Sequence, residues 1–68
     1  MKTRFQIVDH KDGIVLDTVL ESRNRFSALH ELLRLSGIHY NPAQFKERAG
    51  WVEFRGAYAT YKTSTRFG

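Results

Sequence analysis

The basic and aromatic residues near the C-terminal end are those whose types and spacing suggest a chemistry. Residues 54–68 contain Arg55, Lys62 and Arg66 but no acidic residue. Polar side chains alternate there with small or aromatic ones, which is typical of a strand with one solvent-facing side. Arginine and lysine bind phosphates, and a ring such as that of Tyr58 can stack on an unpaired base. An ordinary solvated strand has the same composition, because threonine, tyrosine and lysine suit exposed strand faces.

A second cationic feature is the segment Ser-Arg-Asn-Arg at residues 22–25, which precedes a leucine-rich run. Arg23 and Arg25 fall where a helix would begin, and cations are unfavourable at that end of the helix dipole. With the free N–H groups of a first helical turn, they form a candidate secondary anion site. The alternative is that they pair with the acidic residues Asp17 and Glu21 of the preceding segment.

The pattern of a catalytic or metal site is missing from the sequence. His10, His30 and His39 fall on a turn, a helix and a loop, without metal-ligand spacing, and the chain has no cysteine. No serine lies in a nucleophile elbow, and no glycine-rich phosphate loop occurs. We therefore expect a protein that is not an enzyme and that uses no cofactor and no metal.

Two strands and a turn are predicted at the N-terminal end. Residues 3–10 and 14–21 are rich in β-branched and aromatic residues, and Asp12-Gly13 between them is a strong hairpin signal. Period-two alternation places Phe5 and Ile7 on one face, with Ile14 and Leu16 opposite them.

A helix is predicted at about residues 23–36, capped by Ser22 and ended by Gly37 in the left-handed conformation. Ile38 would then pack on Leu33. The apolar residues at helical spacing are Phe26, Ala28, Leu29, Leu32, Leu33 and Leu35.

A second, short helix is predicted to follow. Asn41 would cap it, Pro42 would occupy its first position, and Gly50 would end it. Tyr40 and Phe45 have the spacing of a hydrophobic staple across its first turn.

Residues 51–56 and 57–67 read as two more strands, joined near Gly56-Ala57. The predicted fold is a single α+β domain over residues 1–68, of order ββα(α)ββ. It has a four-stranded antiparallel sheet with one long and one short helix packed on one face.

The opposite face of this sheet is the candidate binding surface. If Val52 and Phe54 point toward the helices, then Trp51, Glu53 and Arg55 point away. Alternation in the other strands gives this face one clear acid, Glu53, and an excess of basic and aromatic residues. The basic and aromatic members are Lys2, Arg4, Trp51, Arg55, Tyr58, Lys62 and Arg66.

The overall charge favours an anionic partner. Lysine and arginine number 11 against 7 acidic residues, which gives a net charge of +4. The lack of cysteine is typical of a reducing, cytoplasmic setting, and no apolar run has the roughly 20 residues that span a bilayer. We expect no membrane partner.

The leading hypothesis is a small module that binds nucleic acid or a nucleoprotein complex with Arg4, Trp51, Arg55, Tyr58, Lys62 and Arg66. The alternative is a phage- or plasmid-type modulator that inhibits a host or defence protein. It would add a strand through residues 57–67 or offer its basic face to an acidic groove. A homodimer that buries Trp51 and Tyr58 is a third possibility.

The order of strand, Asp-Gly turn, strand, serine and Ala/Leu-rich helix resembles the opening of many small phage and plasmid reading frames. A sheet covered by one helix layer is also similar to the β-sheet DNA-reading domains of integrases. The first resemblance has no specific motif and the second is one of fold, so neither implies a role for any residue.

Overall fold

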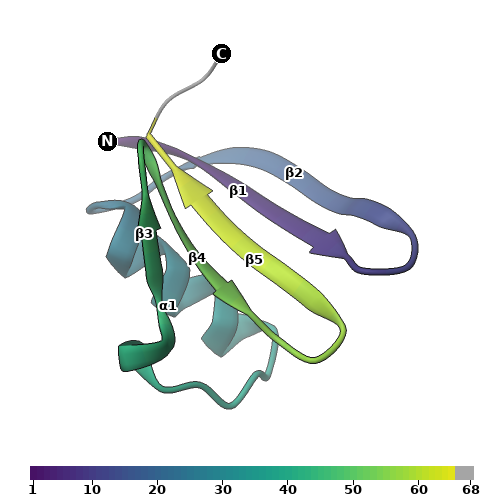
Figure 1. The fold of residues 1–68 in the computed structure, drawn as a ribbon. Coiled ribbons are helices and arrows are strands. Elements are labelled where there is room, and N and C mark those ends of the chain that lie inside the picture. The colour runs from purple at the N-terminus through teal and green to yellow at the C-terminus, as the bar shows by residue number, and fades with distance from the viewer. Residues whose placement is uncertain (66–68) are drawn as a thin grey trace.

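The computed structural model describes residues 1–65, which form a five-stranded antiparallel sheet and one α-helix (Figure 1). The small α+β class is thus confirmed, but the sheet has one strand more and one helix fewer than predicted. The helix is α1 (Arg25–Leu35), and the strands stand in the order β2-β1-β5-β4-β3 across the sheet. Their bounds are β1 (Lys2–Asp9), β2 (Gly13–Glu21), β3 (Lys46–Arg48), β4 (Trp51–Arg55) and β5 (Ala59–Ser64).

The β1–β2 hairpin turns where the Asp-Gly signal predicts. The Asp9 carboxylate accepts the backbone N–H groups of Lys11 and Asp12, and Gly13 has a φ of 85°. Ile7 lies opposite Leu16 as predicted, but a register shift between Ile7 and Val8 places Ile14 opposite Val8 instead. The shift is a bulge, which period-two counting does not include.

Helix α1 begins two residues later than predicted. Its cap is Asn24, whose side chain accepts the N–H of Ser27, whereas Ser22 hydrogen-bonds Thr3 across the sheet. The predicted stop is confirmed: Gly37 has a φ of 70°, and the N–H of Ile38 donates to Leu33 O at 3.0 Å.

The predicted second helix is wrong beyond its first turn. Asn41 caps a single 3-10 turn, Pro42–Gln44, by accepting the N–H of Ala43. The chain then enters β3, and Gly50, with a φ of 88°, lies in the β3–β4 turn and does not end a helix. Tyr40 and Phe45 nevertheless stack at 5.8 Å between centroids, so the staple contact forms without the helix.

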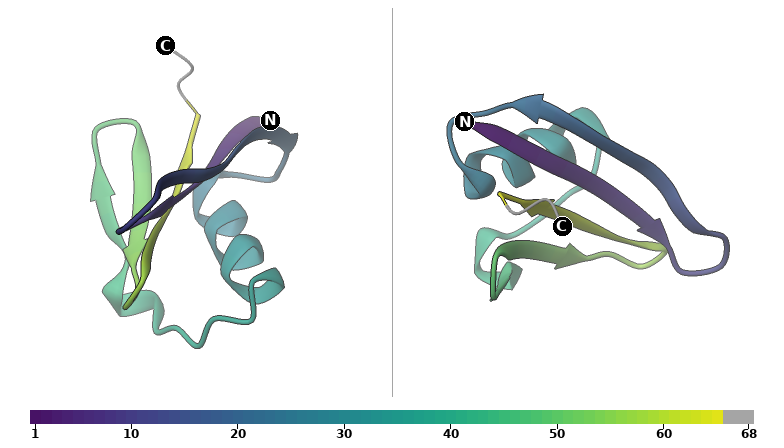
Figure 2. Two further views of the ribbon diagram at one scale, coloured as in Figure 1. Left: turned by 90° about the vertical axis from the view of Figure 1, so that its right-hand side faces the viewer. Right: turned by 90° about the horizontal axis from the view of Figure 1, so that it is seen from above.

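The core lies between α1 and one side of the sheet, where α1 packs on β5, β4 and β1 (Figure 2). The Thr63 hydroxyl is fully buried and donates to Arg25 O at 2.6 Å, which ties the first turn of the helix to the central strand. Phe26 and Leu35 of the helix are exposed and belong to no buried cluster. The buried apolar residues are Phe5, Ala28, Leu29, Leu32, Leu33, Val52, Phe54, Ala59 and Tyr61.

Within residues 1–65, no helix combines the length and apolarity that crossing a bilayer requires.

Candidate binding surface

We call the side of the sheet opposite α1 the helix-free face. Residues directly opposite each other in neighbouring strands share a face, so the register defines its members. Its members among the described residues are Lys2, Arg4, Gln6, Val8, Ile14, Asp17, Val19, Glu21, Lys46, Arg48, Trp51, Glu53, Arg55, Thr60, Lys62 and Ser64.

Lys62 lies near the centre of the helix-free face. It stands between Gln6 of β1 and Glu53 of β4, on the middle strand of the sheet. Its ammonium group lies 5.4 Å from the centroid of the Trp51 ring, a cation–π contact. The sequence predicted that Trp51 and Lys62 would share this face, and the register confirms it. A positive charge and an indole ring are therefore adjacent on an open sheet.

Arg4 is held by an acid that the sequence analysis did not place on this face. Its guanidinium donates to the two carboxylate oxygens of Asp17 at 2.8 and 2.7 Å, and Gln6 adds a third hydrogen bond to Asp17. The hydrogen bond from Arg4 is the main reason that the pKa of Asp17 is lowered, and Asp17 in turn raises the pKa of Arg4. The charge of Arg4 is thus compensated.

Glu21 likewise faces this side, where it pairs with the N-terminal amine of Met1 at 3.0 Å. That hydrogen bond lowers the pKa of the Glu21 carboxyl. The prediction that Glu53 is the only acid of the face is therefore wrong, because β2 also contributes Asp17 and Glu21.

Glu53 joins Trp51 to the edge strand β3. Its carboxylate accepts from Arg48 Nε at 3.3 Å and from Trp51 Nε1 at 3.3 Å. The indole is therefore fixed by a hydrogen bond at its nitrogen and by Lys62 over its ring. This arrangement orients the only tryptophan of the chain within the surface.

Four basic side chains of the helix-free face form no ion pair among residues 1–65. Six basic residues lie there, and two of them, Arg4 and Arg48, pair with acids. The four without an ion pair are Lys2, Lys46, Arg55 and Lys62, and the charge of Lys2, opposite Glu21, also helps to lower the pKa of that carboxyl.

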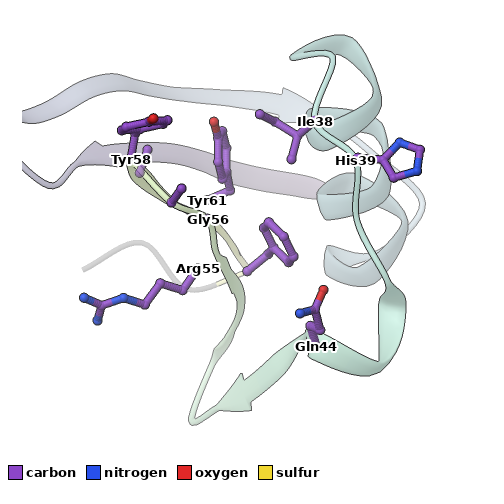
Figure 3. A pocket seen from close by; sticks show the side chains of 10 residues that line it. Ile38, His39, Gln44, Arg55, Gly56, Tyr58 and Tyr61 are labelled. Carbon is purple, nitrogen blue, oxygen red and sulfur yellow. The ribbon is translucent and has the colours of Figure 1, made fainter.

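Tyr58 lies apart from this group, in the turn between β4 and β5, where it is 83% exposed. It borders a hollow of about 440 Å³ whose lining also includes Ile38, Phe54 and Tyr61. Figure 3 shows Tyr58 and Tyr61 beside this hollow, whereas the Arg55 side chain extends away from it. Arg66, and Phe67 in the same predicted strand, lie outside the described residues.

The two arginines near the start of α1 do not meet the acids proposed for them. Arg25 pairs with Glu47 of β3 at 2.9 Å and lies over the Phe26 ring, and its buried Nε has no partner within residues 1–65. Arg23 precedes the helix and forms no ion pair among the described residues. Arg25 therefore links the helix to the sheet edge and its charge is paired with Glu47, while the anion site at Arg23 and Arg25 stays a prediction.

Two of the three histidines lie within hydrogen-bond distance of a side-chain hydroxyl. His30 Nδ1 and the Tyr40 hydroxyl are 3.0 Å apart, and His10 Nε2 lies 3.0 Å from the Thr60 hydroxyl. No group of three or more histidine or acidic residues within residues 1–65 could hold a metal ion.

No family model, no curated protein and no solved structure matches this chain.

Sequence reasoning missed Lys46 and Arg48, because it assigned residues 41–49 to a helix. A signal for β3 exists in retrospect: Ala49-Gly50 separates a short charged run from the Trp51 strand, as a tight turn does. Asp17 and Glu21 join this face through the register between β1 and β2, which places them opposite Gln6 and Lys2 and which alternation in the other strands does not contain.

Proposed function

We propose that the protein is a non-enzymatic module that binds single-stranded nucleic acid with its helix-free face. The observation that supports this most directly is the contact of Lys62 with Trp51 at the middle of an open sheet. Nucleic-acid-binding sheets combine basic groups for the phosphates with aromatic rings for unpaired bases.

The phosphates and the bases of the bound nucleic acid would contact different residues of the face. Lys62 and Arg55 lie two residue pairs apart along the β4–β5 ladder and would contact successive phosphates. Lys46 lies in the same cross-strand row as Lys62, beyond Glu53, and would extend the path toward the β3 edge. Trp51 would stack on a base, which contributes about 1–3 kcal/mol in comparable sites.

The single tryptophan makes this proposal directly testable, because Trp51 fluorescence reports from the proposed surface. We would titrate the protein with oligothymidine and oligouridine of about 15 nucleotides, the length of one typical single-strand site. Quenching with micromolar affinity at low salt, weakened by added salt, is the expected result.

Variants locate the site. Lys62→Ala should weaken binding and flatten its salt dependence by about 0.7 in slope, since one phosphate contact is lost. The matched control is Lys11→Ala, which makes the same charge change in the β1–β2 turn, away from the sheet face. Undetectable binding at low salt, or equal losses in the two variants, would overturn the proposal.

A second candidate function is binding of a protein partner, and the exposed Tyr58 beside the hollow favours it. An apolar side chain of a partner could enter between Ile38 and Tyr61, with Tyr58 at the rim. We do not propose strand addition through β5, because β5 is hydrogen-bonded on both sides by β1 and β4.

The two functions differ in what a lysate pull-down retains. A partner protein that stays bound after nuclease treatment, and that is lost in Tyr58→Ala but not in Lys62→Ala, would support the second function. A partner that disappears with nuclease would support the first.

A further inference from the structure

The two edges of the sheet differ in a way that points to a docking surface on β2. The β3 edge is three residues long, all charged, which is a common means of blocking strand pairing. The β2 edge is nine residues long and carries an unusual amount of exposed apolar surface for an edge strand. Its exposed apolar side chains are Ile14 (59%), Val15 (59%), Leu16 (36%), Val19 (46%) and Leu20 (54%).

The hydrogen bonds of the hairpin show which backbone groups of β2 are free. The N–H of Ser22 donates to Met1 O, so Ser22 directs its backbone groups toward β1. Because this direction alternates along an antiparallel strand, Leu20, Thr18 and Leu16 also face β1. Asp17 and Val19 therefore direct their N–H and C=O groups outward, away from the sheet.

The bulge limits the regular part of this edge. It falls between the pairs Ile7–Leu16 and Val8–Ile14, so the ladder is uninterrupted only from Leu16 to Glu21. The turn end of the hairpin also extends beyond α1 (Figure 2). A strand that docks here would pair with the stretch from Leu16 to Glu21.

We propose that a second copy of this chain occupies that edge, with the two β2 strands antiparallel about a two-fold axis at Thr18. This pairing is independent of the function proposed for the helix-free face. Thr18 would lie opposite the partner subunit's Thr18, and Leu16 opposite the partner subunit's Leu20. The two exposed leucines of each copy would thus be covered by those of the other.

The charges of β2 select this register over its neighbour. Centring the pair on Asp17 would place two carboxylates directly opposite each other, which is destabilising. Centring it on Thr18 places Asp17 opposite the partner subunit's Val19, so that no like charges face each other. Asp17 and Val19 are also the residues with free backbone groups, so these pairs exchange their hydrogen bonds.

The two-fold symmetry determines how the helices and sheets of the two copies are arranged. A two-fold axis perpendicular to the sheet keeps both helices on one side and both helix-free faces on the other. The five strands of each copy would then form one continuous sheet of ten strands. The β3 strands, with their charged residues, would be its only edges among the described residues.

A disulfide test is available because the chain contains no cysteine. Thr18→Cys is a small change at a partly exposed site, and it would place two sulfur atoms across the axis at a pair that exchanges no hydrogen bonds. Such pairs have Cα atoms about 4.5 Å apart, within disulfide range. We expect a covalent dimer to form under mild oxidation, faster than with Asp17→Cys or Ile14→Cys.

Equal cross-linking of all three variants, or faster cross-linking of Asp17→Cys, would overturn the pairing. Asp17→Cys would be the favoured variant in the neighbouring register, so the comparison tests the alignment as well as the contact.

A second measurement does not depend on new covalent bonds. In sedimentation equilibrium, Val19→Asp should raise the dimer dissociation constant by about tenfold or more, because it opposes the partner subunit's Asp17 at two symmetric places. Ile14→Asp makes the same charge change at a site of similar exposure but outside the paired stretch, so it should leave the constant nearly unchanged. A wild-type protein that stays monomeric to millimolar concentration, or equal effects of both variants, would refute the proposal.

Discussion

Replacing Asp17 by asparagine should strengthen nucleic-acid binding. In the structure, the Asp17 carboxylate holds the Arg4 guanidinium through two hydrogen bonds, so Arg4 is not free to contact phosphate. Asp17→Asn removes the negative charge but keeps the size of the side chain, and it leaves Arg4 on the helix-free face. A gain in binding is a stringent test, because a misfolded variant would show a loss.

The size of the gain follows from the number of unpaired cations. Four basic side chains of the face form no ion pair within residues 1–65, and each phosphate contact on a single strand contributes about 0.7 to the salt slope. The wild-type slope of log K against log salt should therefore lie near −2.8, and that of Asp17→Asn near −3.5. At about 0.1 M salt, the difference corresponds to roughly fivefold tighter binding.

The assay is the Trp51 fluorescence titration at several salt concentrations. The matched control is Glu47→Gln, which makes the same charge change but releases Arg25, on the helix side of the sheet. An unchanged slope in Asp17→Asn, or an equal gain in Glu47→Gln, would refute the reasoning that the helix-free face binds the phosphates.

Three further predictions concern the ion pair and the core. In an NMR pH titration, the carboxyl pKa of Asp17 should lie below its ordinary value and return toward it in Arg4→Gln, because the hydrogen bond from Arg4 is the main cause of the shift. Because the pKa of Asp17 is lower in the folded than in the unfolded protein, its contribution to stability is complete above the ordinary carboxyl pKa and is lost as pH falls through the folded pKa. Equal Asp17 pKa values in the wild type and in Arg4→Gln would contradict the role given to Arg4. Leu33→Ala, at a fully buried site, should lower the free energy of unfolding by about 3–5 kcal/mol, out of about 3–10 kcal/mol in total for a domain of this size. The control Leu35→Ala, at a 74% exposed site, should change it little. Equal shifts of the two variants in thermal denaturation would count against the packing described. Thr63→Val should cost about 1 kcal/mol in urea denaturation, because it removes the hydrogen bond to Arg25 O without changing side-chain volume, and an unchanged midpoint would show that this bond does not stabilise the helix on the sheet.

Local signals in the sequence predict much of the fold. The Asp12-Gly13 turn, the helix stop at Gly37 and the alternation of Val52 and Phe54 with Trp51 each depend on a few neighbouring residues. Such features are encoded by backbone preference and period, so a single sequence contains them.

The prediction of a second helix was wrong because tertiary contacts compete with local helix signals. Asn41 and Pro42 do start a helical turn, but Lys46 to Arg48 pair with β4 instead of continuing it. Cross-strand hydrogen bonds decided this outcome, and helix-capping rules do not contain them.

The candidate surface was predicted in its central residues but not in its charge balance. Trp51, Lys62 and Arg4 lie on the face that alternation assigns to them. The pairing of Arg4 with Asp17 depends on the register between β1 and β2, which places Asp17 opposite Gln6 and so within reach of Arg4 on the same face. A charge count along the sequence cannot show which cations are already compensated.

The most direct test of the central claim is an amide chemical-shift map of the 15N-labelled protein as unlabelled oligothymidine is added. We predict that the largest changes fall on Gln6, Glu53, Arg55 and Lys62, together with the Trp51 indole N–H. Changes confined to α1 or to the hollow beside Tyr58, or a spectrum that does not change at low salt, would contradict the account.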